Sequence, residues 1–144
     1  MPPVVSVLIV THDSRAHFPR LNAHLQALTT PYRLLVYDNA SAPAQRPTPQ
    51  DFPPHAILLQ SERNLGFAAA NNRLVEQADT EFVTLLNPDA FPERDWLKHL
   101  LAGAARYPHA AAFGSTQIMA QDERRYDGMG DAYHAFGFFW RGGH

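Results

Sequence analysis

The sequence contains no cysteine, so disulfide bonds, thiolate zinc sites and cysteine nucleophiles are excluded. Charge is also scarce, since charged residues make up 18% of the 144 residues and the formal net charge is −2. A protein that binds nucleic acid by neutralising phosphates needs a basic excess, so we expect no nucleic-acid partner. No apolar run approaches the roughly 20 residues of a membrane-spanning helix, and the N-terminus lacks the basic start of a signal peptide. These absences predict a cytoplasmic protein.

Glycine and lysine are missing where many phosphate-binding proteins need them. Glycine first occurs at Gly66, and Lys98 is the only lysine. The turn after the first predicted strand therefore cannot be a dinucleotide fingerprint or a P-loop, because both need glycine where the backbone approaches phosphate. A sugar-1-phosphate nucleotidyltransferase would also need a glycine-rich loop at this turn, which disfavours that function. A lysine-based phosphate clamp fits poorly with a single lysine.

Short apolar runs alternate with amphipathic segments along the chain, and they predict strands and helices respectively. Strands are predicted at residues 4–10, 34–37, 56–59, 81–86, 110–113 and 116–119, and helices at residues 15–28, 67–78 and 93–106. Phe67 and the alanines after it, Ala68–Ala70, are expected to pack their helix against the sheet. Prolines crowded between residues 42 and 54 predict a surface connection with little regular structure. Strands alternating with helices define an α/β domain with a mostly parallel sheet.

Four consecutive predicted strands end at an acid or an amide side chain. These residues are Asp13, Asp38, Asn64 and Asp89. Because the carboxyl ends of parallel strands gather along one edge of a sheet, we expect the four side chains to line a common ligand-binding edge. Asp13 or Ser14 is also suited to cap the helix predicted at residues 15–28.

Asp89 has two interpretations. The buried strand in FVTLLNPDA must end near Asn87, since Pro88 has no backbone N–H to donate. Asp89 is then a hard oxygen ligand of the kind that Mg²⁺ or Mn²⁺ accepts beside phosphate. Alternatively, Asp89 caps a helix that begins near Pro92.

Four segments together resemble family 2 glycosyltransferases of the GT-A fold. They are VSVLIVTHDS, VYDNAS, ERNLGFAAANN and FVTLLNPDA, in the same order and spacing as in that family. The NPD sequence is most similar to rhamnosyltransferase-like members. The resemblance implies a Rossmann-like three-layer sandwich, truncated before the acceptor-binding half. It implies a nucleotide-sugar-binding domain at residues 1–120, followed by a tail at 121–144 that starts the acceptor-side region.

The resemblance also implies inverting transfer of a sugar from a nucleotide-diphosphate sugar to a saccharide or lipid-linked acceptor, as in cell-wall or surface polysaccharide biosynthesis. A divalent metal, Mg²⁺ or Mn²⁺, would neutralise the leaving diphosphate. The implied metal ligand is Asp89, and Asn87 replaces the first aspartate of the family's metal motif. The implied nucleotide-binding residues are Thr11, His12, Asp13, Asp38, Arg63, Asn64 and Gly66. Such an enzyme would be cytoplasmic and peripheral to the inner membrane.

No catalytic base is assigned, because in the family this residue lies in the later acceptor-binding half. Asp127 and Asp131 in DGMGD are weak candidates, and a turn rich in Gly and Asp is the plainer interpretation. The alternative function is a non-catalytic nucleotide-sugar-binding or interaction module that lacks the acceptor half. An aromatic cluster close to the C-terminus would favour self-association if it is exposed. Its members are Phe136, Phe138, Phe139 and Trp140.

Overall fold

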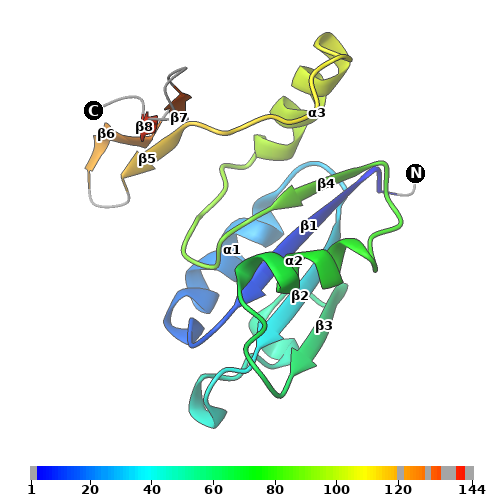
Figure 1. The fold of residues 1–144 in the computed structure, drawn as a ribbon, viewed down its shortest axis with the longest axis vertical. Helices are drawn as coiled ribbons and strands as arrows, with labels where there is room; N and C mark the ends of the chain where they lie inside the picture. Colours follow the sequence, from blue (N-terminus) through cyan, green and yellow to red (C-terminus); the bar gives the residue numbers. More distant parts are fainter. Residues whose placement is uncertain (1–2, 120–121, 129–130, 134–138, 142–144) are drawn as a thin grey trace. The chain divides into compact units, whose positions relative to one another are not determined.

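The structure is a computed structural model that describes residues 3–119, 122–128, 131–133 and 139–141. The chain forms two compact units, Met1–His99 and Leu100–His144. Figure 1 shows the parallel sheet and helices of the first unit and the short strands of the second. The domain boundary predicted at residue 120 falls inside the second unit.

The first unit is built on a four-stranded parallel sheet in the order β3-β2-β1-β4. Its strands are β1 (Val5–Thr11), β2 (Arg33–Asn39), β3 (Ala56–Ser61) and β4 (Phe82–Leu85). All seven residues of β1 are buried, because this strand lies between β2 and β4 and is covered on both faces. The predicted α/β class with a mostly parallel sheet is therefore confirmed.

Two helices cover opposite faces of this sheet, with α2 (Phe67–Val75) in front and α1 (Phe18–Ala27) behind in Figure 1. Ala70 and Leu74 of α2 pack against a cluster that includes Leu8 and Leu35. The buried side chains of α1 are Phe18, Leu21 and Leu25, which lie at helical spacing. A third helix, α3 (Trp96–Arg106), begins in the first unit and ends in the second.

Several local predictions are wrong. Phe67 is 57% exposed, and of the residues expected to pack α2 against the sheet only Ala70 is buried, together with Leu74. The segment predicted as one helix begins with a 3-10 turn, η1 (Arg15–His17), and no side chain caps it. The Oγ of Ser14 donates to the carbonyl oxygen of His12 at 2.9 Å instead. Residues 110–113 form no strand.

The proline-rich connection contains two 3-10 turns, η2 (Pro43–Gln45) and η3 (Pro49–Asp51). The backbone N–H and the hydroxyl of Thr48 both donate to Asp51 Oδ2, at 2.7 and 2.8 Å. This capping arrangement gives the predicted surface connection a fixed shape.

β4 forms one edge of the sheet. Val83 and Leu85 are 46% and 50% exposed, and both lie on the face that also carries Ser6 and Leu8. Among the described residues, β4 pairs with β1 alone. The sheet therefore ends in a strand that is apolar on one face and unpaired along its outer side.

The second unit contains two antiparallel hairpins: β5 (Gln117–Met119) with β6 (Asp122–Gly128), and β7 (Asp131–Tyr133) with β8 (Phe139–Arg141). The strand predicted at residues 116–119 corresponds to β5. Phe136 and Phe138 lie outside the described residues, and only the backbone of Phe139 and Trp140 is described. Self-association through this aromatic cluster stays a prediction.

Candidate functional site

The carboxyl ends of β1 and β2 bring two of the predicted site residues side by side. Thr11 and Asp38 are register partners in the parallel pair, so their side chains lie on the same face of the sheet. Both residues are completely buried. One oxygen of Asp38, Oδ1, accepts a hydrogen bond from the backbone N–H of Ser41 at 3.2 Å.

Two buried polar atoms at this point lack a hydrogen-bond partner within the described part of the chain: Thr11 Oγ1 and Asp38 Oδ2. A buried acceptor without a donor costs roughly 1–3 kcal/mol, so native proteins rarely keep one without a reason. Two such atoms on neighbouring strands indicate a site where a ligand supplies the missing hydrogen bonds.

The loops that follow β1 and β2 are bound to each other reciprocally. The backbone N–H of Asp13 donates to Ser41 Oγ at 2.9 Å, and the N–H of Ala42 donates to Asp13 Oδ1 at 2.8 Å. His12 and Asp13 are exposed, with His12 Nε2 3.8 Å from Asp13 Oδ2. Asp13 thus joins two loops rather than capping the following helix.

A second set of hydrogen bonds joins the end of β2 to the loop between β3 and α2. Asn39 is buried, and its side chain contacts Asn64, Leu65 and Gly66. Asn64 is exposed, and its Oδ1 also accepts the backbone N–H of Gly66 at 2.8 Å. Arg63 is exposed in the same loop, and no described residue pairs with its guanidinium group.

Positive φ angles concentrate at this edge of the sheet. Among the described residues they occur at Asp13 (51°), Ala40 (65°) and Gly66 (80°), which follow β1, β2 and β3 respectively. Backbone strain of this kind gathers at ligand-binding sites, where the surrounding contacts hold it in place. Strain and unpaired polar atoms therefore point to the same edge.

Asp89 lies in the turn after β4, closed by the N–H of Ala90 donating to the carbonyl oxygen of Asn87 at 3.1 Å. The capping alternative is wrong, because α3 begins only at Trp96. Asp89 is exposed at the carboxyl end of a strand that neighbours β1, so it belongs to the same edge as Thr11.

The described residues contain no group of three His, Asp or Glu side chains that could hold a metal by themselves. Mg²⁺, however, is commonly bound by one or two carboxylates together with substrate phosphates. The free carboxylate of Asp89 fits an ion shared with a diphosphate. It does not fit an ion held by the protein alone.

The segment after Asp89 is held against α1. Arg20 Cζ lies 4.1 Å from the centroid of the Phe91 ring, and His24 Nδ1 lies 3.0 Å from the carbonyl oxygen of Pro92. Since that oxygen only accepts, Nδ1 carries the proton. Thr29 Oγ1 donates to Asp95 Oδ1 at 2.7 Å.

Sequence analysis missed Asn39 and Ser41, which are both 3% exposed and join the loops of the site. Both follow Asp38 in the quoted segment VYDNAS. The signal was their polarity directly after a buried strand, where polar side chains must find partners.

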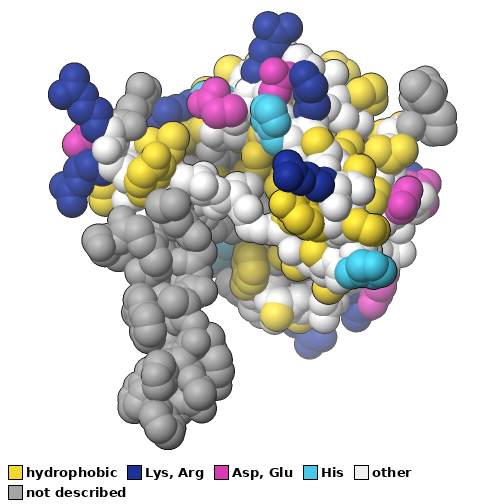
Figure 2. All heavy atoms as spheres, turned by 90° about the horizontal axis from the view of Figure 1, so that it is seen from above, with side chains coloured by type: hydrophobic (Ala, Val, Ile, Leu, Met, Phe, Trp, Pro, Cys, Tyr) yellow, Lys and Arg dark blue, Asp and Glu magenta, His cyan; other side chains and the backbone are white. Residues whose placement is uncertain are grey.

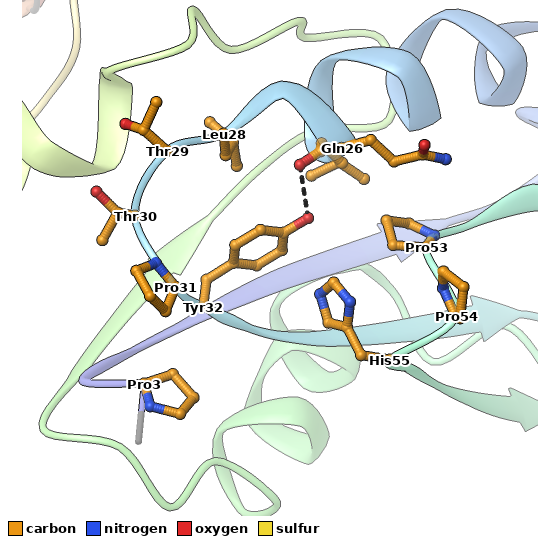
Figure 3. A pocket seen from close by; sticks show the side chains of 11 residues that line it. Pro3, Gln26, Leu28, Thr29, Thr30, Pro31, Tyr32, Pro53, Pro54 and His55 are labelled. Carbon is orange, nitrogen blue, oxygen red and sulfur yellow. Dashed lines mark hydrogen bonds between the residues drawn. The ribbon is translucent and has the colours of Figure 1, made fainter. Parts of the chain in front are cut away.

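A different hollow, of about 620 Å³, lies where β2 and β3 begin, at the amino end of the sheet. Figure 3 shows the Tyr32 ring between the 29–31 loop and His55, with its hydroxyl donating to the carbonyl oxygen of Leu25 at 2.8 Å. Burial raises the pKa of Tyr32 to about 12. This hollow contains none of the predicted site residues.

On the face shown in Figure 2, basic, acidic and histidine side chains are interspersed with apolar ones, and the described residues there form no continuous basic surface. The expectation of no nucleic-acid partner stays a prediction. None of the described helices is long and apolar enough to cross a membrane.

Comparison with solved structures identifies the fold as GT-A. The S. aureus TarS fragment 1–349 in complex with UDP-GlcNAc is 19% identical, with a TM-score of 0.62 over 85% of this chain and 39% of that chain. The mannosyltransferase PcManGT from Pyrobaculum calidifontis, in complex with GDP-Man and Mn²⁺, is 21% identical, with a TM-score of 0.61 over 86% of this chain and 38% of that chain.

Residues 6–142 match the family model described as glycosyl transferase family 2, so the chain belongs to this family. N-acetylglucosaminyl-diphospho-decaprenol L-rhamnosyltransferase, from two strains of Mycobacterium tuberculosis, is 29% identical over 126 residues. The match covers 79% of this chain and 41% of the relative. The predicted resemblance to family 2 and to its rhamnosyltransferase-like members is confirmed.

Proposed function

We propose that the carboxyl edge of this sheet binds a nucleotide-diphosphate sugar and supplies the donor site for an inverting glycosyl transfer. The observation that carries this proposal is the pair of buried, unpartnered atoms Thr11 Oγ1 and Asp38 Oδ2. A nucleobase or ribose offers the N–H and O–H groups that would satisfy them. Relatives whose names specify a nucleotide sugar or a sugar transfer support the same reading.

The remaining site residues divide by position. His12 and Asp13 line the exposed rim above Thr11, where they contact the nucleotide. Arg63 meets the diphosphate, because its guanidinium is unengaged within the described chain and is suited to phosphate. Asn64 and Gly66 shape the loop beside it. We assign donor binding to the domain predicted at residues 1–120, which contains all of these residues.

Asp89 would hold a divalent metal together with the donor's diphosphate, with Asn87 beside it in the same turn. The ion, when bound, neutralises charge that develops on the leaving diphosphate. The protein's part is to keep one carboxylate exposed at the end of β4.

Inverting transfer also needs a base that removes the proton from the acceptor hydroxyl. We assign this role to no residue, and Asp127 in β6 and Asp131 in β7 stay candidates only. The acceptor is a saccharide or lipid-linked saccharide, by analogy with a relative named for a decaprenol-linked substrate. The reaction is placed in the cytoplasm, beside the inner membrane, in cell-wall or surface polysaccharide biosynthesis.

Calorimetry with UDP, dTDP and GDP, with Mg²⁺ or Mn²⁺ present, tests the proposal. We expect the wild-type chain to bind at least one of them. Asp38→Asn should weaken binding about tenfold or more, because it replaces an acceptor oxygen with a donor at the buried position. Asp89→Ala should remove the dependence of binding on metal.

Asp79→Asn is the matched control, because Asp79 pairs with Arg33 at the other end of the sheet. It should bind as the wild type does. The proposal is wrong if no nucleotide binds at millimolar concentration, or if Asp38→Asn binds like the control. Nucleotide binding without transfer to any saccharide acceptor would support the non-catalytic binding module instead.

A further inference from the structure

Asn39, the last residue of β2, uses both ends of its side-chain amide. Its Oδ1 accepts the backbone N–H of Leu65 at 2.8 Å. Its Nδ2 donates to Asn64 Oδ1 at 2.8 Å and lies 3.4 Å from the carbonyl oxygen of Gly66. One buried side chain therefore holds three consecutive residues that lie 25 or more positions further along the chain.

These hydrogen bonds fix the orientation of both amides. Asn64 Oδ1 accepts from Asn39 Nδ2 and from the N–H of Gly66, so turning the Asn64 amide over would set two donors against each other. Turning the Asn39 amide over would do the same at the N–H of Leu65. The set of bonds has a single arrangement, which makes the position of the loop specific.

The loop that Asn39 holds is strained. Gly66 has φ 80° and ψ 165°, a region that only glycine visits readily, and α2 begins at the next residue. Such a turn needs other contacts to hold it. Asn39 accepts the N–H of Leu65 directly, and it holds Asn64 Oδ1, which accepts the N–H of Gly66. Arg63 and Asn64, on the same loop, are exposed at the donor edge.

We infer that Asn39 is a positioning residue, which holds the 63–66 loop in the shape that receives the diphosphate of the donor. The inference rests on the proposed function. Asn39 itself is buried and reaches the donor only through this loop.

Asn39→Asp tests the inference with little change in volume. The introduced carboxylate keeps an acceptor for the N–H of Leu65 but places an oxygen against Asn64 Oδ1 and the carbonyl oxygen of Gly66. We expect about tenfold weaker binding of whichever nucleoside diphosphate binds the wild type at about pH 7.5. At about pH 5 binding should recover relative to the wild type, because the buried carboxyl group takes up a proton and becomes a donor again.

Asn22→Asp on α1 is the matched control, because it makes the same charge change and still accepts from Gln26 Nε2. It should follow the wild type at both pH values. Asn64→Ala removes the hydrogen bond between Asn39 Nδ2 and Asn64 Oδ1 by changing its exposed partner, and it should also weaken nucleotide binding about tenfold. Circular dichroism melting of every variant separates weak binding from failure to fold.

The outcomes are distinct. If Asn39→Asp binds like the wild type at about pH 7.5, or is weak at both pH values, the inference is overturned while the proposed function stands. If Asn39→Asp does not fold, Asn64→Ala decides: weaker binding supports the inference, and unchanged binding overturns it. If the wild-type chain binds none of the three nucleoside diphosphates, both the proposed function and this inference fall.

Discussion

Asp38 has one oxygen committed to Ser41 and the other left without a donor in the described part of the chain. The hydroxyl oxygen of Thr11, the register partner of Asp38, is also buried without a hydrogen-bond partner in the described part of the chain. Each unpaired buried group lowers stability by roughly 1–3 kcal/mol in the absence of a ligand. A bound molecule that donates to both would recover that free energy, so ligand binding should raise the melting temperature of the first unit.

Two glycines give opposite predictions for the same substitution. Gly66→Ala should lower the free energy of unfolding by roughly 1–3 kcal/mol, because φ 80° and ψ 165° strain any residue with a Cβ atom. This loss is expected even though no atom lies within 4 Å of the added methyl group. Urea unfolding followed by circular dichroism measures the change.

Gly103→Ala provides the comparison. Gly103 lies within α3, and an added Cβ would make ordinary contacts at 3.6 Å with the Phe113 ring. Alanine favours a helix interior over glycine by roughly 1 kcal/mol, so this variant should be more stable. Equal effects at the two glycines would show that the loop at Gly66 relaxes without cost.

At the scale of elements, α1 and the segment after β4 form one assembly. Arg20, His24 and Thr29 contact a stretch that runs from Phe91 to Asp95. The proposed metal ligand lies immediately before this stretch. These contacts restrict how far the Asp89 turn can move. None of the three side chains that make them is a proposed donor-binding residue.

The bond between Thr29 and Asp95 predicts a pH effect. The pKa of Asp95 is lowered, chiefly by the hydrogen bond from the Thr29 hydroxyl, with smaller contributions from Lys98, Arg94 and His99 and an opposing desolvation effect. A lowered pKa in the folded chain stabilises it above the unfolded pKa, and the gain is lost as the pH falls through the folded value. Thr29→Val should raise the pKa of Asp95, which an NMR titration of its carboxyl carbon measures.

Thr30→Val is the control for this titration, since it removes a neighbouring hydroxyl for which the described structure shows no bond to Asp95. As the pH falls below about 4, the ordinary pKa of an aspartate, the wild type should also lose more stability than Thr29→Val. If both threonine variants leave the pKa of Asp95 where it is in the wild type, the Thr29 bond is not its cause.

The four strands of the parallel sheet were predictable because each is an apolar run bounded by proline, glycine or polar residues, whereas the largely charged strand β6 was not predicted. β1, whose seven residues are all buried, is the clearest case. Helix ends were less predictable, since Asp13 and Ser14 look like caps in the sequence and form other bonds in the structure. Phe67 was misplaced because hydrophobicity does not reveal which side of a helix faces the sheet.

The candidate site was predictable in part. Strand ends carrying Asp38 and Asp89 indicate the ligand-binding edge, because parallel strands place their carboxyl ends together. Asn39 was not recognised, since its partners Asn64, Leu65 and Gly66 are distant in sequence and only the folded chain brings them together. The spacing of polar residues in the sequence identifies the edge of the sheet at which they lie. Hydrogen bonds between the loops of that edge are visible only in the folded structure.

For the first unit as a whole, the two ends of the sheet differ in character. The carboxyl end has strained turns, buried polar atoms without partners among the described residues, and loops that bind one another. The amino end has prolines, the Tyr32–His55 ring pair and a hydroxyl bonded to the end of α1. The unpartnered buried atoms therefore lie at the carboxyl end, which is where we propose that the donor binds.

The outer side of β4 leads to a last prediction. Lysine on an edge strand opposes pairing with another sheet, so Val83→Lys should lower the concentration-dependent light scattering of the chain. Gln26→Lys adds the same charge on α1 and should leave the scattering as in the wild type. Equal improvement by both variants would attribute the effect to net charge and not to the edge.

Val83 and Leu85 also bear on how a sample of this chain should be handled. Backbone groups along an open strand can recruit a neighbour without prior unfolding, so dilution should preserve a monodisperse preparation better than cooling does. The time for which a sample stays monodisperse is then limited by how often molecules collide. A sample stored at low concentration should therefore stay monodisperse longer than a colder, more concentrated one.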